Sequence, residues 1–382
     1  MRILLLTKRQ YTGQDLLAAR YGRLWEIPKE LSRRGHEVRG LALSYRELPE
    51  DEIVTEVCPP SPPVVWRSIN AGPTRIRGLW RYYQQALDLG RDWKPQVVMA
   101  SSDTFFIIMG ARIGRLLGAP FVADLYDNYE AFSSARIPGL VRAYRSAVRN
   151  ATVVSCVSGP LRDYVIQAYR RTGSTHAIEN AVDPAVFHPR DKLNCRARLG
   201  LPMDAQIIGT AGALTKGRGI GYLYDAFRDL SGDLENLHLV VAGPRDMPVP
   251  AHPRIHDLGE LPWSDVPVLL NALDVGVICN IDSRFGRYCF PQKAFEMLAC
   301  GVPFCAARVG SMGGLLAPYP EYLFEPASSK SLVSRLRDLV QNPKVPDIAV
   351  PTWAGLAERL ETLILADKGS GEPAYASIKS RE

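Results

Sequence analysis

Short apolar runs alternate with helical patterns along most of this chain, and this alternation constrains the fold more than any other feature. In the first half the strand candidates are RILLLT, GHEVRGLAL, QVVMAS, PFVADLY and TVVSCVS. Runs that are apolar at nearly every position are typical of strands buried on both faces, as in parallel sheets. Helical segments between them, such as residues 16–34 and IIMGARIGRLLG, predict βαβ units.

The second half repeats the pattern with the strand candidates QIIGTAG, HLVVAG, DVGVICN and VPFCAA. A stretch with two prolines and a charge cluster, residues 180–200, separates the halves and is predicted to link them. We therefore expect two doubly wound α/β domains, and the cleft between them is the natural ligand site. The predicted division is 1–187, 188–351, a closing helix at 352–366 that crosses back to the first domain, and a flexible tail at 367–382.

Length and composition exclude several classes of protein. A chain of 382 residues with 46% hydrophobic and 23% charged residues is ordinary and globular, and has room for two cores. No apolar run approaches the roughly 20 residues of a membrane-spanning helix. The opening MRILLLTKRQ is typical of a strand rather than of a signal peptide. The seven cysteines include no CxxC pair, which argues against a metal or disulfide framework and predicts a cytoplasmic protein.

The net charge is +6, and the excess positive charge falls in residues 1–150. It predicts an anionic partner for this half: phosphate, nucleic acid or a membrane surface. A nucleic-acid partner is not expected, since no recognised binding motif accompanies the charge. The segment 136–150 predicts a helix with Arg142, Arg145 and Arg149 on one face. Such a helix either contacts anionic lipid at the inner face of the membrane or packs on its own sheet, and we favour the packing.

The segment CFPQKAFEMLACGVP predicts a short helix that carries Lys293 and Glu296 at its beginning. The two side chains lie three residues apart, on one face. The start of a helix is a ready place for a phosphate. The alternative is a surface ion pair.

A glycine-rich turn between a strand and a helix, residues 209–227, holds Lys216 and Arg218. Its spacing is neither GxGxxG nor that of a Walker A loop. The turn is either a flexible loop with solvated charges or a second phosphate contact. Two basic turns with one glutamate, Glu296, predict a site for a nucleoside diphosphate, in which the carboxylate accepts hydrogen bonds from the ribose.

The chain resembles, over nearly its whole length, the retaining GT-B glycosyltransferases of family four (glycosyl transferases group 1). The motifs are RRGHEV, ENAVDPAVFHP, GALTKGRGIGYLYDAF, HDLGELPWSDVPVLLNALDVGVICN, PQKAFEMLACGVPFCAA and TWAGLAERL. The resemblance implies two Rossmann-like domains facing each other across a cleft. It also implies transfer of a sugar from a nucleotide-sugar donor to a glycan or lipid-linked acceptor, without metal or cofactor.

The resemblance also assigns donor-binding roles. It implies that Arg218 and Lys293 contact the donor diphosphate and that Glu296 binds the donor ribose. In the glycine-rich turn, the family has an arginine at the position that Ala213 occupies in this chain. Lys216 is expected to replace that arginine as a phosphate contact. A family acidic residue near the donor sugar is Tyr288 here, which leaves recognition of that sugar open.

Polar residues follow the strand PFVADLY, where family members often have a histidine; here that position is Tyr126. A carboxylate at this strand end can take the acceptor's proton, and Asp127 is preferred over Asp124. The alternative is that Asp127 caps a helix. The turn with Gly13 matches the family's glycine-rich loop and is expected to approach the donor phosphate or the acceptor. Lys8 and Arg9 lie beside this turn. They either take part in the same site or are surface charges, and the sequence favours neither interpretation.

The expected activity is that of a hexosyltransferase in glycan, glycolipid or polysaccharide biosynthesis. Two other activities stay open: an epimerase or hydrolase of nucleotide sugars on the same fold, and a non-catalytic binding partner. The nucleotide base, the sugar, the acceptor and the oligomeric state cannot be derived from the sequence.

Overall fold

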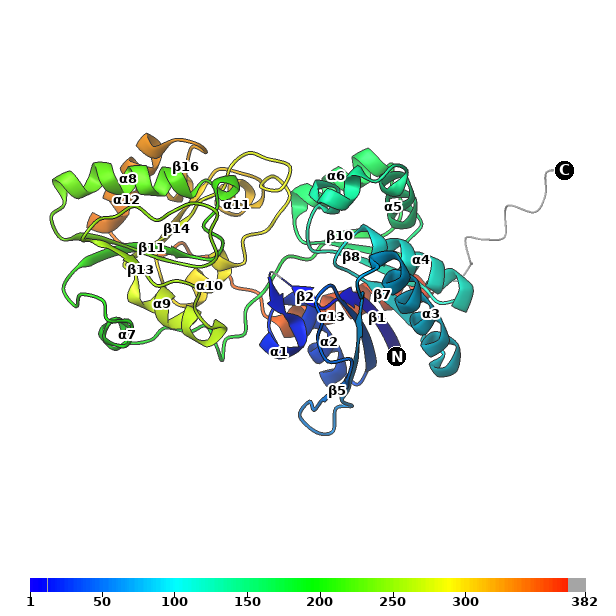
Figure 1. The fold of residues 1–382 in the computed structure, drawn as a ribbon. Coiled ribbons are helices and arrows are strands. Elements are labelled where there is room, and N and C mark those ends of the chain that lie inside the picture. Colours follow the sequence, from blue (N-terminus) through cyan, green and yellow to red (C-terminus); the bar gives the residue numbers. More distant parts are fainter. Residues whose placement is uncertain (12, 370–382) are drawn as a thin grey trace. The chain divides into compact units, whose positions relative to one another are not determined.

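The computed structural model describes residues 1–11 and 13–369 of the chain, which form two compact units (Figure 1). Of the described residues, unit 1 holds 1–11, 13–157, 162–178 and 354–369, and unit 2 holds Ser158–Leu161 and Glu179–Trp353. Apart from the short segment Ser158–Leu161, the chain passes into unit 2 at Glu179, earlier than the residue 188 expected from the sequence. The predicted flexible tail, 367–382, overlaps the end of a helix at its start and otherwise lies outside the described residues.

Unit 1 is built on one eight-stranded sheet in the order β10-β9-β8-β7-β1-β4-β6-β5. Its strands are β1 (Arg2–Lys8), β4 (Glu37–Ser44), β5 (Glu52–Thr55), β6 (Val64–Asn70), β7 (Val97–Ala100), β8 (Phe121–Leu125), β9 (Val153–Cys156) and β10 (Thr175–Ala177). All pairs are parallel except the edge pair β5–β6. The chain runs outward from β1 in one direction and from β7 in the other, so the topological switch point lies between β1 and β7.

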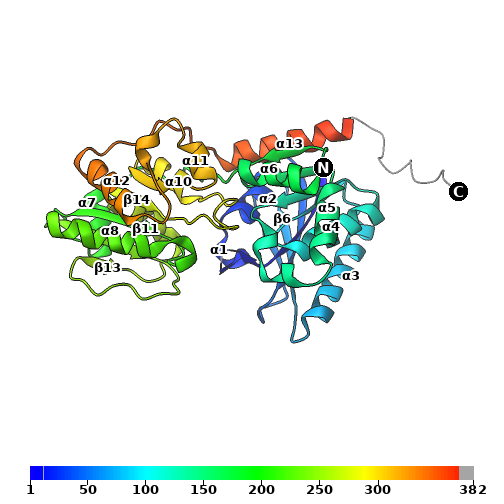
Figure 2. The same ribbon diagram turned by 90° about the horizontal axis from the view of Figure 1, so that it is seen from above.

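The helices of unit 1 cover both faces of this sheet. They are α1 (Leu16–Ala19), α2 (Arg23–Arg33), α3 (Arg75–Trp93), α4 (Thr104–Leu117), α5 (Leu140–Arg149), α6 (Gly159–Tyr169) and α13 (Trp353–Gly369). Two short strands, β2 (Gln10–Tyr11) and β3 (Gln14–Asp15), form a separate hairpin, and the 3-10 turns η1 (Tyr129–Ala131) and η2 (Ser133–Arg136) follow β8. Helices α3, α4 and α5 pack in a row, whereas α2 and α13 lie on the other side (Figure 2).

The closing helix α13 belongs to unit 1, although it follows unit 2 in the sequence. Glu361 on α13 forms an ion pair with Arg34 and a hydrogen bond of 2.8 Å with the ring of His36. These contacts attach α13 to the turn that follows α2.

The predicted helix at residues 16–34 is wrong in one respect, because the structure divides it into α1 and α2. Arg20 adopts a left-handed conformation with φ of 52°, and Gly22 precedes α2 with φ of 75°. A side chain at position 22 would place its Cβ 2.4 Å from the ring of Tyr11. The chain therefore turns at this glycine so that Tyr11 can pack against it.

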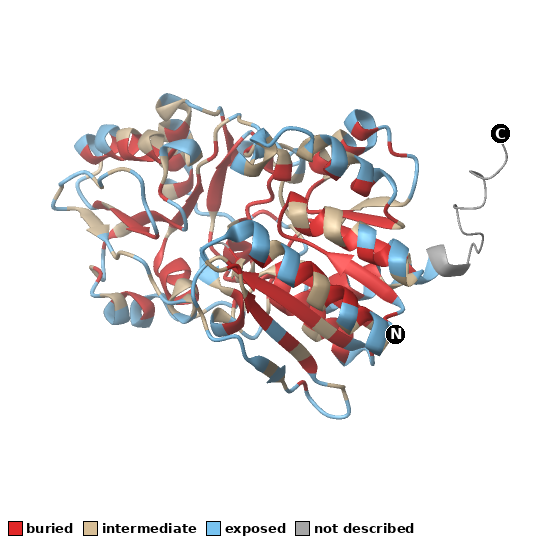
Figure 3. Cartoon of the chain, turned by 45° about the vertical axis from the view of Figure 1, so that its right-hand side comes forward, coloured by how far each residue is buried: buried red, intermediate tan, exposed pale blue. Residues whose placement is uncertain are grey.

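Unit 2 has a six-stranded parallel sheet in the order β13-β12-β11-β14-β15-β16. Its strands are β11 (Gln206–Ala211), β12 (Leu237–Ala242), β13 (Ile255–Asp257), β14 (Val275–Ile278), β15 (Phe304–Ala307) and β16 (Leu323–Phe324). Because the chain passes outward from β11 on one side and from β14 on the other, the switch point lies between these two strands. Buried residues follow the strands of both sheets (Figure 3).

The helices of unit 2 also lie on both faces of its sheet. They are α7 (Lys192–Leu199), α8 (Ile220–Asp233), α9 (Val266–Ala272), α10 (Lys293–Ala299), α11 (Ser311–Leu315) and α12 (Ser329–Gln341), with 3-10 turns η3 (Lys216–Arg218), η4 (Trp263–Asp265) and η5 (Pro320–Tyr322). Helices α8 and α12 pack on one face, and α9 with α7 and α10 packs on the other (Figure 1).

Part of the predicted linker is helical, which the sequence analysis missed. Asp191 caps the start of α7 by accepting a hydrogen bond from the Asn194 amide at 2.7 Å, and Gly200 ends the helix. The buried Arg196 donates to the Asp274 carboxylate at 2.6 Å. The charge cluster of this segment is thus partly folded into unit 2.

Candidate functional site

Apart from Gly13, the residues expected to bind the donor lie in unit 2, at the carboxyl ends of β11 and β14. The loop after β11 contains η3 and therefore Lys216 and Arg218, and α10 begins at Lys293. Ligands of open α/β sheets bind outside the carboxyl ends of the strands at the switch point. The fold thus brings these four side chains, including Glu296, to the end of unit 2 where such a ligand is expected.

Lys293 is the first residue of α10, and its ammonium group lies against the end of β11. Its Nζ donates to Thr210 Oγ1 at 3.3 Å, and a Cβ at Gly212 would lie 3.3 Å from Nζ. Burial, together with a smaller contribution from the charge of Arg218, lowers the pKa of Lys293 to about 8. An anion placed at Gly212 and Lys293 would counter both effects.

Arg218 lies over the ring of Phe285 with its guanidinium carbon 4.0 Å from the ring centroid. Phe285 belongs to the loop after β14, so this cation–π contact joins the loops that follow the two switch-point strands. Lys216 differs, because its side chain is exposed and only its amide is bound, to Asp246 at 2.9 Å. Phe285 was not singled out in the sequence, since an aromatic residue in a loop carries no signal of its own.

Glu296 is buried, with 6% of its surface exposed. Gln292 Nε2 donates to its Oε1 at 3.0 Å. Burial raises the pKa of Glu296 to about 7, although the charge of Lys293 and the bond from Gln292 oppose the increase. A buried carboxylate with spare acceptor capacity is suited to bind a pair of hydroxyl groups. The alternative of a solvated surface ion pair between Lys293 and Glu296 does not fit this burial.

In unit 1, polar residues gather at the carboxyl ends of β1, β7 and β8, next to the switch point. Asp127, half-buried, accepts a hydrogen bond from the Asn128 amide at 2.7 Å. The carboxylates of Asp127 and Asp103 lie close enough to Lys8 to raise its pKa, although burial has the larger, lowering effect. The Lys8 ammonium also lies 5.6 Å from the centroid of the Phe132 ring.

Tyr126 is held in place by its neighbours. Its hydroxyl donates to the Ser102 carbonyl at 3.3 Å, and its ring makes edge contacts with Tyr11 and Tyr129. Burial raises the pKa of Tyr126 well above its usual value. The side chain is therefore a neutral, positioned group rather than an anion.

The structure argues against a catalytic role for Asp124, the second choice of the sequence analysis. Arg23 binds both its oxygens, with distances of 2.7 to 3.0 Å, and both side chains are almost completely buried. Arg23 also donates to Ser155 Oγ and to the Ile178 carbonyl. Such a carboxylate holds strands together and has no access to an acceptor.

Asp103 is a site candidate that sequence reasoning missed. It caps α4 by accepting from the Phe105 amide at 2.8 Å, and burial raises its pKa while Lys8 opposes the increase. The polar run SSD directly after the strand QVVMA was the available signal. Of the two interpretations left open for Arg9, that of a surface charge is wrong, because Arg9 is buried and forms an ion pair with Asp15 at 2.9 Å.

Gly13, expected to contact the donor phosphate, lies in the turn of the β2–β3 hairpin. Its φ is 87°, its carbonyl accepts from Arg46 at 3.4 Å, and no described atom lies within 4 Å of the position its Cβ would take. The backbone of this turn is thus open on one side.

Two further observations concern metal ions and membranes. Within residues 1–11 and 13–369, no group of three or more His, Cys, Asp or Glu side chains is arranged to hold a metal ion. In the same part of the chain, every helix is too short or too polar to cross a bilayer.

Comparison with known families now identifies the class of protein. Residues 23–186 match the family described as Glycosyltransferase Family 4, and residues 205–342 match the family described as Glycosyl transferases group 1. The two matches cover both units. The chain belongs to this family of GT-B glycosyltransferases, as its sequence predicted.

One relative illustrates this assignment. The D-inositol 3-phosphate glycosyltransferase of Stackebrandtia nassauensis is 36% identical over 149 residues, which are 34% of this chain and 32% of that protein. The match therefore spans about a third of the relative's length.

Solved structures show the GT-B fold over nearly the whole chain. Sucrose-phosphate synthase from Thermosynechococcus elongatus superposes with a TM-score of 0.70 at 18% identity, over 96% of this chain and 94% of that one. HepE from Anabaena, solved in complex with UDP-glucose, superposes with a TM-score of 0.66 at 17% identity, over 97% and 99%. The two-domain architecture predicted from the sequence is confirmed as GT-B.

Proposed function

We propose that this glycosyltransferase moves a hexose from a nucleoside-diphosphate sugar to an acceptor hydroxyl, with retention of the anomeric configuration. The observation that carries the proposal is the position of Lys293. This half-buried ammonium group lies at the carboxyl end of β11, next to a glycine and three residues from the buried Glu296. A cation and a carboxylate so arranged match the diphosphate and the ribose of one nucleotide.

The diphosphate is bound by cations from both loops of unit 2. Lys293 and Arg218 bind its oxygens, and the exposed Lys216 reaches it in place of the arginine that the family has at Ala213. When the sugar–phosphate bond breaks, negative charge develops on the leaving diphosphate, and these cations stabilise it. We propose that these cations stabilise the charge that a metal ion would otherwise stabilise. The enzyme then needs its donor substrate but no cofactor.

The ribose is bound by Glu296, whose ionised form accepts hydrogen bonds from both hydroxyls. Because burial raises the pKa of Glu296 to about 7, the free enzyme holds a mixture of protonated and ionised forms near neutrality. Hydroxyl donors favour the ionised form, so ribose binding and ionisation support each other.

In unit 1, Asp127 is the preferred group to take the acceptor's proton, helped by the leaving diphosphate. Its half-exposed carboxylate and the nearby Lys8 support this assignment, whereas Tyr126 positions the strand end and Asp124 is structural. Gly13, in an open turn, is proposed to let a phosphate or the acceptor approach the backbone. Retention rests on the resemblance to family four alone.

We place the enzyme in the cytoplasm, in glycan, glycolipid or polysaccharide biosynthesis, where nucleotide sugars are the donors. The seven cysteines are all free thiols in the structure, which fits a reducing compartment. A membrane contact through α5 is not part of the proposal. Arg145 binds Glu130 at 2.7 Å and Arg149 binds the Tyr169 carbonyl at 2.8 Å, so two arginines of the expected lipid-binding face are used within unit 1.

The test is a thermal-shift screen of the purified chain against UDP, GDP, ADP and CMP and their common sugar conjugates. A ligand at a hundred times its Kd stabilises by about 2.7 kcal/mol, which is easily measured. The shift should disappear in Glu296→Ala and Lys293→Ala and persist in Lys330→Ala, which changes an exposed lysine of α12 in the same unit. An unchanged shift in both site variants would overturn the assignment of the donor site.

Assays on the same purified protein distinguish transfer from two other functions. An epimerase or hydrolase would convert the identified nucleotide sugar without any acceptor. A non-catalytic partner, motivated by Ala213, Tyr126 and Tyr288, would bind the nucleotide without turnover. We favour transfer, and an assay that follows both donor and acceptor distinguishes the three.

A further inference from the structure

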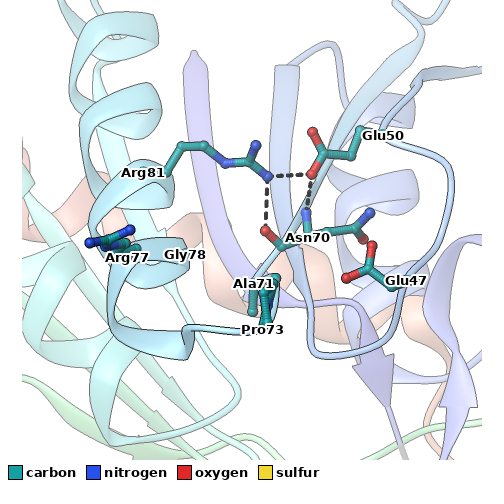
Figure 4. Close-up of a pocket in the computed structure, with 9 residues that line it drawn as sticks. Glu47, Glu50, Asn70, Ala71, Pro73, Arg77, Gly78 and Arg81 are labelled. Atoms are coloured by element: carbon teal, nitrogen blue, oxygen red, sulfur yellow. Dashed lines mark hydrogen bonds and ion pairs between the residues drawn. The ribbon is translucent and has the colours of Figure 1, made fainter.

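Unit 1 contains a pocket, of about 350 Å³, that no residue of the proposed donor or catalytic groups lines (Figure 4). It lies at the carboxyl end of β6, between the loop that follows β4 and the first turns of α3. Its volume is at the lower end of the roughly 300–1,000 Å³ typical of small-molecule sites. The lining residues are Glu47, Glu50, Asn70, Ala71, Gly72, Pro73, Arg77, Gly78 and Arg81.

Asn70, the last residue of β6, makes the pocket rigid. Its side-chain amide donates to the Leu48 carbonyl at 2.6 Å, and its oxygen accepts from the Leu48 amide at 3.3 Å. Its backbone N–H donates to Glu50 at 2.6 Å, and its carbonyl accepts from Arg81 at 2.8 Å. One residue thus holds the loop and the helix on either side of the pocket, so the pocket is formed before any ligand binds.

Gly78 sets the depth of the pocket. A Cβ at this position would lie 2.0 Å from the Ala71 carbonyl oxygen. Only glycine allows α3 to approach the end of β6 this closely. The wall formed by backbone groups therefore depends on this residue type.

The charges of the lining side chains cancel, but only one of the two arginines and one of the two glutamates are engaged with each other. Arg81 forms an ion pair with Glu50, which satisfies both groups within the wall (Figure 4). Arg77 and Glu47 are exposed and have no hydrogen-bonding or ionic partner within residues 1–11 and 13–369. The pocket thus offers one unused guanidinium donor and one unused carboxylate acceptor, with no net charge.

We propose that this pocket binds an uncharged sugar unit of the acceptor. The inference rests on the proposed function and names the chemical class of its acceptor. Sugar hydroxyls both donate and accept, so one hydroxyl can donate to Glu47 and another can accept from Arg77. A rigid wall of satisfied groups loses little conformational entropy when it binds such a ligand.

The same charges disfavour a phosphate in this pocket. A phosphate needs several donors, but Arg81 is already engaged by Glu50, and a second carboxylate, Glu47, lines the same pocket. Two like charges at close range repel. The acceptor group in this pocket is thus a neutral saccharide rather than a sugar phosphate.

Ligand-observed NMR on the full chain, with and without saturating UDP, tests the proposal. The probes are the methyl glycosides of glucose, mannose, galactose and N-acetylglucosamine, each compared with a phosphate of the same sugar. The test variants are Arg77→Ala and Glu47→Gln. Their controls are Arg91→Ala, an exposed arginine on the same helix, and Glu52→Gln, an exposed glutamate of the neighbouring strand β5.

The expected result is that at least one neutral glycoside binds and that both test variants raise its Kd roughly ten-fold or more. The controls should leave that Kd unchanged. Tighter binding of the sugar phosphate would overturn the neutral ligand, and binding of no glycoside, or binding unaffected by both test variants, would overturn the site.

Thermal shifts with nucleotides separate this inference from the proposed function. Nucleotide binding that is lost in Glu296→Ala, together with no glycoside effect of Arg77→Ala, would leave the donor site standing and remove the pocket. Glycoside binding without any nucleotide binding would support the pocket and overturn the donor site. Circular dichroism of each variant confirms that a lost signal is not lost folding.

Discussion

The Lys293 ammonium group donates a 3.3 Å hydrogen bond to the Thr210 hydroxyl, so the first residue of α10 is fixed to the carboxyl end of β11. The two strands next to the switch point of unit 2 are β11 and β14, and α10 follows β14 in the chain. The bond therefore joins the two structural elements that an anionic ligand would contact together. Four predictions follow from this site and its counterpart in unit 1.

The first prediction is that Lys293→Met weakens binding of nucleoside diphosphates but not of nucleosides. A hydrogen bond to a charged group contributes about 1.5–3 kcal/mol, so the Kd for the diphosphate should rise roughly 10- to 100-fold. Calorimetric titration of the nucleoside diphosphate that the thermal-shift screen identifies, and of the corresponding nucleoside, measures both. Equal losses for the two ligands would mean that Lys293 supports the fold of the site rather than the phosphates.

The second prediction is that Glu296→Gln stabilises the free protein while it impairs nucleotide binding. Because burial raises the pKa of Glu296 from 4.5 to about 7, the folded state binds this proton more tightly than the unfolded state. The wild type is therefore penalised increasingly as pH rises from about 4.5 through 7, by up to about 3 kcal/mol. Glutamine carries no such penalty.

Chemical denaturation of wild type and Glu296→Gln at pH 4.5 and pH 8 measures this difference. The variant should match the wild type at the lower pH and be more stable at the higher pH. If Glu296→Gln were less stable than the wild type at pH 8, the ionised Glu296 carboxylate would have a favourable partner. Its burial would then not lower the free energy of unfolding.

The third prediction concerns protons exchanged when a nucleoside diphosphate binds. The pKa of Lys293 is lowered to about 8, and a bound diphosphate would raise it. Binding near pH 8.5 should therefore take up a fraction of a proton, whereas binding between pH 6 and 7 should release a fraction of a proton from Glu296. Titrations in buffers of different ionisation enthalpy measure both.

Lys293→Arg is the matched variant for this prediction, because arginine stays charged throughout the range. It should abolish the uptake near pH 8.5 and keep the release at lower pH. Proton uptake that persists in the arginine variant would assign the titration to another group.

The sequence predicted the family and the central strands of both sheets, but it missed the outer strands β5, β6, β10, β13 and β16. Runs such as QIIGTAG and VPFCAA are apolar at nearly every position, and the structure makes them the buried strands β11 and β15. The break between α1 and α2 was missed because it depends on Tyr11, which packs against Gly22 from outside the helix. Local patterns cannot reveal such a contact.

The candidate site was predicted unevenly for a similar reason. Lys293 and Glu296 lie three residues apart, so local spacing was sufficient to pair them. Asp124 was overrated because its partner, Arg23, lies far away in the sequence, and only the folded sheet brings the two together. The polar lining of the pocket in unit 1, such as Asn70 and Arg77, likewise comes from separate segments and gave no motif.

The last prediction separates the two aspartates that follow β8. Asp124→Asn leaves the buried Arg23 without its counter-charge, and breaking a buried ion pair typically costs 3–5 kcal/mol. Asp127→Asn changes a half-buried side chain and keeps an oxygen for the Asn128 amide, so stability should change by less than about 0.5 kcal/mol. If Asp127 takes the acceptor's proton, kcat should fall roughly 10²- to 10⁴-fold with little change in donor Kd. Denaturation and steady-state kinetics of the two variants measure this, and a fully active Asp127→Asn would leave the leaving diphosphate as the base.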